Sequence, residues 1–216
     1  MGWRRVVAVS VAVAAVGAGV LAFPVVLQTL EEREEQRLLR LYATGLSACD
    51  HYPDDIDALI QKHLPAPASV SITVFPSFSE PQAVRIVGDD LYYFVLDFPL
   101  YERGDRPPPK LNTEGVPTTH RSRIPSAVTT ELAAVLASDI AQAKAELPLG
   151  LDGTVFFFRT SGGTCGMAWS PDRGSRALSF VEIFELLAKH AKASDPAEAA
   201  AQNREILRII KSLQAR

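Results

Sequence analysis

A long apolar segment without charged residues covers residues 6–28. A helix needs ~20 apolar residues to cross the hydrocarbon core of a bilayer, so we expect residues 1–28 to contain a transmembrane helix that acts as a signal anchor. Arg4 and Arg5 precede this segment, and the first charges after it are acidic, from Glu31 onward. By the positive-inside rule, the N-terminus stays in the cytoplasm and the rest of the chain becomes periplasmic or extracellular.

A cleaved signal peptide is the alternative interpretation, because residues 20–22 (Val-Leu-Ala) offer small residues for a cut site. The domain would then be secreted. Against cleavage, the apolar run continues to Leu27 and helical spacing follows it without a break. Ala14, Ala18 and Ala22 also form a stripe of small residues along which two such helices can pack into a homodimer. The alternative, which we favour, is that small residues are simply common in such segments.

Helical spacing continues after the uncharged segment. It runs through residues 29–48 and places Cys49 almost directly above Leu38, so we expect a helical stalk there. An extracytoplasmic domain then covers residues 49–216. Its first helix is expected at residues 54–64, because three aspartates fill the first turn and a proline follows the end.

Beyond this helix, apolar residues alternate with polar ones, which is typical of strands. Strands are expected at residues 69–74, around 84–86, at 91–98, at 154–159 and at 165–169. Turn residues at 88–90 and 160–163 indicate two hairpins. Phe156, Phe157 and Phe158 make both faces of their strand apolar, which indicates a position near the centre of the sheet.

Three further helices complete the pattern. They are expected at residues 126–147, at 175–192 with Ser175 as the cap, and after Asp195 and its following proline. The sequence therefore predicts an α+β protein. Its parts are an N-terminal transmembrane helix and one domain with an antiparallel sheet of about five strands covered by helices.

Residues 99–125 interrupt the pattern with six prolines and no sustained periodicity. Loops of this length in compact domains are usually functional or disordered, so a long Pro-rich loop is expected here. Five cations lie in the loop against three acids, although the whole chain is acidic. The candidate partner-binding residues are these cations, Arg103, Arg106, Lys110, Arg121 and Arg123. A solvated loop without a partner is the alternative.

The chain has 216 residues, of which 47% are hydrophobic and 22% charged, and its net charge is -3. These values exclude a disordered tail, a collagen and a disulfide-dense miniprotein. The residues after position 28 carry 20 basic and 25 acidic side chains, a net charge of -5. A surface of that sign does not bind nucleic acid by counterion release, so we expect no nucleic-acid partner.

Cys49 and Cys165 are the only two cysteines, and both follow the predicted anchor. In an oxidising compartment, two cysteines at inward-facing positions favour a disulfide, with two separate buried thiols as the alternative. The bridge would join the stalk helix to a central strand. Closing so long a loop contributes ~4–5 kcal/mol in the chain-entropy model.

Candidate ligands for a metal or for acid–base chemistry are densest near residue 50. They are Cys49, Asp50, His51, Asp54, Asp55 and Asp57. Imidazole and carboxylate groups so close in sequence could form such a site. Acids in the first turn of a helix are also explained by capping and by the helix dipole, and this structural interpretation is the one we favour. No HExxH, CxxC, GxSxG or P-loop motif occurs, and we expect no cofactor.

Together these features favour a membrane-anchored extracytoplasmic binding or accessory protein without catalytic activity. Its expected partner is another envelope protein, which it would neutralise or scaffold. The alternative is a small envelope hydrolase in which His51 works with Asp54 or Asp55, with or without a metal.

Overall fold

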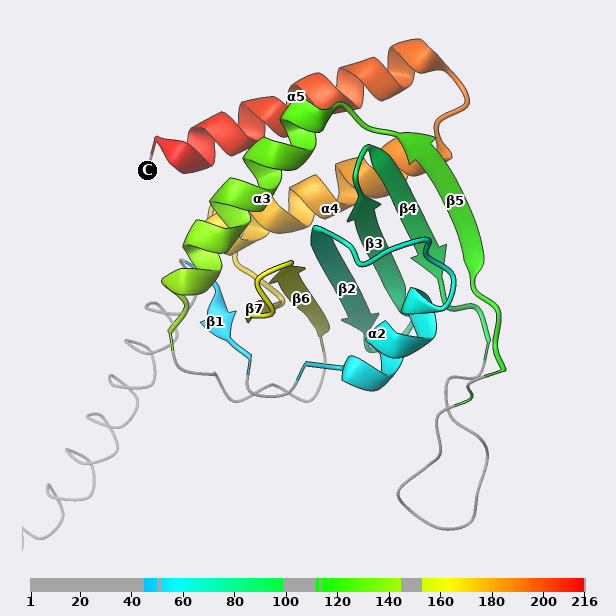
Figure 1. Cartoon of the computed structure of the whole chain (residues 1–216). Helices are drawn as coiled ribbons and strands as arrows, with labels where there is room; N and C mark the ends of the chain where they lie inside the picture. Colours follow the sequence, from blue (N-terminus) through cyan, green and yellow to red (C-terminus); the bar gives the residue numbers. More distant parts are fainter. Residues whose placement is uncertain (1–44, 50–51, 99–111, 113, 145–152, 216) are drawn as a thin grey trace, which may run out of the picture. The chain divides into compact units, whose positions relative to one another are not determined.

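A computed structural model of the chain describes residues 45–49, 52–98, 112, 114–144 and 153–215. The described residues form an α+β fold, as predicted, with four helices and a seven-stranded antiparallel sheet (Figure 1). The helices are α2 (Asp54–Gln61), α3 (Ser126–Ala141), α4 (Arg176–Lys192) and α5 (Pro196–Gln214). The strands are β1 (Ser47–Ala48), β2 (Val70–Pro76), β3 (Gln82–Val87), β4 (Asp90–Val95), β5 (Thr118–Arg123), β6 (Thr154–Thr160) and β7 (Cys165–Trp169).

The strands are arranged in the order β1-β7-β6-β2-β3-β4-β5, and every neighbouring pair is antiparallel. Between β3 and β4, Val87 pairs with Asp90 across a two-residue turn. Gly88 has a φ of 59° in this turn, a left-handed conformation that glycine adopts without steric cost. The hairpin of β6 and β7 lies beside β2, which puts β6 inside the sheet as its three phenylalanines predicted.

Two strands were not predicted. β1 pairs with Met167 and Gly166 of β7, so the end of the expected stalk helix is a strand instead. β5 lies within residues 99–125, all of which were expected to be a loop. It has no apolar residue because it is a largely exposed edge strand, and its neighbour β4 supplies the pairing. The predicted count of about five strands is therefore too low by these two.

Three helices cover one face of the sheet. α3 packs on β2, β6 and β7, α4 crosses β3, β4 and β5, and α5 packs on α3 and α4. Figure 1 shows α4 passing behind β3 and β4, with α2 in front of the sheet. Ser175 caps α4 as predicted, since its Oγ accepts a 3.0 Å hydrogen bond from the N–H of Leu178. α3 ends at Ala141, earlier than the predicted residue 147.

The opposite face is covered by α2. Ile56, Leu59 and Ile60 of this helix are buried against the sheet residues Ala83 and Phe94. This small apolar cluster is separate from the main core under α3, α4 and α5. It leaves room on the same face for the polar residues described below.

The predicted transmembrane helix at residues 1–28 lies outside the described residues, as does the predicted stalk up to residue 44. Among the helices that the structure does describe, none is both long enough and apolar enough to cross a membrane.

Candidate functional site

A row of polar residues crosses the sheet face on which α2 lies. Strand register places six residues from neighbouring strands next to one another: Cys165, Arg159, Ser71, Arg85, Tyr92 and Arg121. The three arginines occupy every second strand. The row runs from the disulfide-bonded strand β7 to the exposed edge strand β5.

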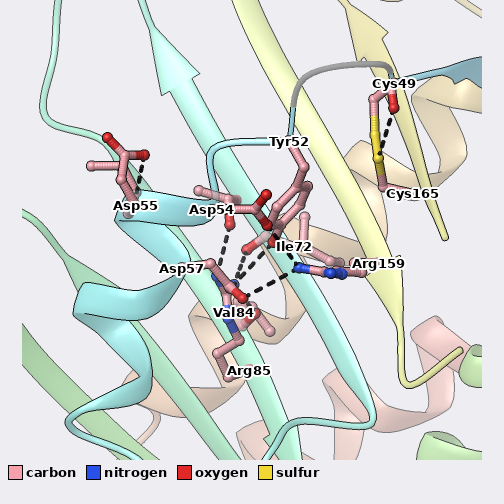
Figure 2. A network of polar contacts seen from close by, with 12 residues as sticks. Cys49, Tyr52, Asp54, Asp55, Asp57, Ile72, Val84, Arg85, Arg159 and Cys165 are labelled. Atoms are coloured by element: carbon pink, nitrogen blue, oxygen red, sulfur yellow. Dashed lines mark hydrogen bonds and ion pairs between the residues drawn. A yellow bond between two sulfur atoms is a disulfide. The ribbon is translucent and has the colours of Figure 1, made fainter. Parts of the chain in front are cut away.

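Arg85 lies in the middle of this row and is only 1% exposed. Its Nη1 donates to the carbonyl oxygens of Ile72 and Val84, at 3.0 and 2.9 Å. Its Nη2 donates to Thr73 Oγ1 at 2.9 Å and to Asp57 Oδ1 at 2.7 Å (Figure 2). A buried cation is costly unless it is paired and hydrogen-bonded, and here both conditions are met.

Asp57 belongs to a second set of contacts at the start of α2. Arg159 Nη1 lies 3.3 Å from Asp54 Oδ1 and 3.6 Å from Asp57 Oδ2. The Arg159 guanidinium also stacks on the Tyr52 ring, 4.7 Å from its centroid, and the Tyr52 hydroxyl donates to Asp57 at 3.3 Å. Burial raises the pKa of Tyr52, which keeps the hydroxyl protonated and able to donate. Two acids thus neutralise two arginines across the gap between helix and sheet.

Asp54 and Asp55, the two described residues of the predicted hydrolase site, have different partners. Asp54 is paired with Arg159, whereas the Asp55 carboxylate accepts a 2.8 Å hydrogen bond from the N–H of Ile56 in its own helix. Figure 2 shows Asp55 pointing away from the other polar side chains. Asp50 and His51 lie outside the described residues. Within the described part of the chain, no group of three His, Cys, Asp or Glu side chains could hold a metal ion.

Cys49 and Cys165 form a disulfide, as predicted, with their Cα atoms 5.8 Å apart. Cys49 does not lie on a helix, because it directly follows strand β1. The bridge therefore joins two parts of the sheet edge, β1 and β7, rather than a stalk helix and a strand. It also fixes the chain three residues before Tyr52, next to Arg159 in the polar row.

Two of the five candidate partner-binding residues, Arg121 and Arg123, lie on β5. Arg121 is 2.9 Å from Asp90 Oδ2 and Arg123 is 3.3 Å from Asp90 Oδ1, so one carboxylate faces two cations. Their side chains are 57% and 78% exposed, and each keeps most of its surface open to solvent. The other three candidates, Arg103, Arg106 and Lys110, lie outside the described residues.

On the other face of β5, Ser122 contacts a buried histidine of α4. The distance from Ser122 Oγ to His190 Nδ1 is 2.9 Å. Burial lowers the pKa of His190, and its Nε2 has no hydrogen-bond partner in the described part of the chain. No carboxylate of the described residues hydrogen-bonds this imidazole, so the pair lacks the group that orients the base in a catalytic triad.

Sequence reasoning missed Arg85, Arg159 and His190. Arg85 is the single charge in the otherwise apolar segment 83–87 of β3, and this was a usable signal of a buried ion pair. Arg159 ends a similar run in β6. His190 gave no signal, since a histidine in the last turn of a helix is usually exposed and interacts with the helix dipole.

We compared the chain with protein-family models, with curated proteins and with solved structures, and no match was found in any of the three.

Proposed function

We propose that this chain is a membrane-anchored extracytoplasmic binding or accessory protein whose domain recognises another envelope protein. The disulfide between Cys49 and Cys165 carries the proposal. Structural disulfides persist in oxidising compartments and are rare in the cytosol. The apolar segment at residues 6–28, preceded by arginines, offers a route to such a compartment.

The ion pairs formed by the carboxylates of the domain support a binding role over a catalytic one. Asp57 and Asp54 are engaged by arginines of the sheet, and Asp139 is engaged by Arg176. A catalytic acid or base must exchange a proton with a substrate, whereas these carboxylates are held in ion pairs that tie elements together. Arg121 and Arg123 keep solvent-exposed surface on the edge strand β5, where a partner can reach them.

The test is affinity purification of the tagged full chain from gently solubilised membranes, after mild cross-linking in the intact cell. The matched control keeps residues 1–44 and carries an unrelated globular domain in place of residues 45–216. We expect the full chain, but not the control, to retain a defined envelope protein that also retrieves this chain in the reciprocal experiment. Recovery of the full chain alone, or of the same proteins with the control, would contradict the proposal.

A further inference from the structure

Among the strands that the structure describes, β5 has a neighbour on one side only, which is β4. The N–H of Ile124 donates to the carbonyl oxygen of Asp89 at 2.9 Å, which makes this pair a hydrogen-bonded one. In an antiparallel ladder such pairs alternate, so the backbone groups of Thr119, Arg121 and Arg123 point away from β4. In the described part of the chain, no hydrogen bond reaches these outward N–H and C=O groups.

Positive charge flanks this free edge on both faces of the sheet. Arg121 and Arg123 lie on the α2 face, where Asp90 offsets one of the two. On the other face, Lys192 at the end of α4 places its Nζ 5.0 Å from the ring centroid of Tyr93, the residue that pairs with His120 of β5. The acid at the opposite end of the strand is Asp97, which accepts a hydrogen bond from Thr118. Arg121 and Arg123 thus lie at the end of β5 next to the β3–β4 turn, where the neighbouring acids are Asp89 and Asp90.

We propose that the free edge of β5 binds an extended acidic segment of the partner protein, which adds a further strand to the sheet. The outward backbone groups would supply the hydrogen bonds, and acidic residues at alternate positions would face Arg121 and Arg123. This inference rests on the proposed function and names the surface and the chemistry that would carry it.

A second copy of this chain fits the edge poorly. Antiparallel pairing of two β5 strands centred on Arg121 or on Arg123 places that arginine directly opposite its own copy, which is destabilising. Pairing centred on Thr119 brings in Pro117, which has no N–H to donate. Charged edge residues commonly prevent self-association of sheets. The same arginines that disfavour pairing with a second copy attract an acidic strand.

The first test measures binding of a fluorescent peptide to the full chain in a neutral detergent. The peptide has ten residues, in which glutamate alternates with valine. Two control peptides replace each glutamate by lysine or each valine by proline, the latter keeping the charge without forming a strand. We expect salt-sensitive binding of the glutamate–valine peptide only. Failure of this peptide to bind at low salt, or equal binding of the proline peptide, would overturn the proposal.

Variants then locate the site. Arg121→Gln combined with Arg123→Gln should weaken binding of the glutamate–valine peptide by about tenfold, because two charge contacts are lost. The matched control is Arg204→Gln combined with Lys211→Gln on the exposed side of α5, which should leave affinity unchanged. Equal affinity of both double variants would overturn the proposal.

Thr119→Pro provides a second variant that removes one outward N–H without touching a hydrogen bond to β4. It should weaken peptide binding while the melting temperature stays close to that of the unaltered chain. Unchanged affinity would contradict strand addition. Self-association of the full chain that is lost when Arg121→Gln and Arg123→Gln are combined would contradict an acidic partner segment as the occupant of the edge. If affinity purification finds an envelope partner but these variants have no effect on the peptide, the proposed function stands and the β5 edge is not its site.

Discussion

Arg85 and Asp57 form an asymmetric ion pair between the sheet and α2. The Arg85 side chain is 2% exposed and the Asp57 side chain is 26% exposed, although their Nη2 and Oδ1 atoms lie 2.7 Å apart. If the pair is broken, the carboxylate can regain water but the guanidinium cannot. The free energy of the pair therefore depends on which partner is removed.

Asp57→Ala should lower the free energy of unfolding by ~2–4 kcal/mol, because it leaves the buried Arg85 without its counter-charge. Asp55→Ala is the matched control, since Asp55 lies in the same helical turn and only bonds its own helix. That change should cost ~1 kcal/mol or less. Urea unfolding of both variants measures the difference, and equal losses would contradict the role assigned to the pair.

Cys165→Ser should destabilise the domain by ~4–5 kcal/mol if the bridge acts mainly by restricting the unfolded chain. The two cysteines are 116 positions apart, so the loop that the bridge closes is long. Unfolding with and without dithiothreitol should show the same loss in the unaltered chain and no further loss in the variant. A chain whose stability is insensitive to dithiothreitol would contradict this prediction.

Stability should fall below neutral pH because of His190. Burial lowers its pKa in the folded domain, so the unfolded chain binds the proton first as pH decreases. The free energy of unfolding therefore drops as pH falls from about 6.5, the ordinary histidine value, towards the lower folded pKa. His190→Gln should flatten the curve between pH 7 and pH 5.5. A curve of unchanged slope would show that other groups control this range.

Arg176→Lys should destabilise the packing of α3, α4 and α5. Arg176 donates through Nε and Nη2 to the two carboxylate oxygens of Asp139, and through Nη1 to the carbonyl oxygen of Leu213. Lysine cannot reproduce this planar arrangement, so we expect a loss of ~1–3 kcal/mol in the free energy of unfolding. Arg204→Lys on the exposed side of α5 serves as the control and should change little.

Several features that depend on residues close together in the chain were predicted correctly from the sequence. The cap at Ser175, the turn at Gly88 and the interior position of β6 all follow from local patterns. β5 could not be predicted because an exposed edge strand has no apolar face, and β1 has only two residues. Neither segment carries the period-two signal on which strand prediction depends.

The candidate site was harder to predict for a different reason. Its aspartates were identified, but their partners Arg85 and Arg159 come from strands that lie 28 and 105 positions away from the residues they contact. Strand register alone brings them together, and register is set by the packing of the whole sheet. The disulfide was predictable because the chain contains only two cysteines.

A reporter joined to the C-terminus tests most directly whether the folded domain lies outside the cytoplasm, as we propose. Alkaline phosphatase, which is active only where its own disulfides form, should be active when fused after Arg216 of the full chain. A fusion that lacks residues 1–28 should be inactive. Activity of a cytoplasmic reporter on the full chain, together with free thiols at Cys49 and Cys165, would contradict the account.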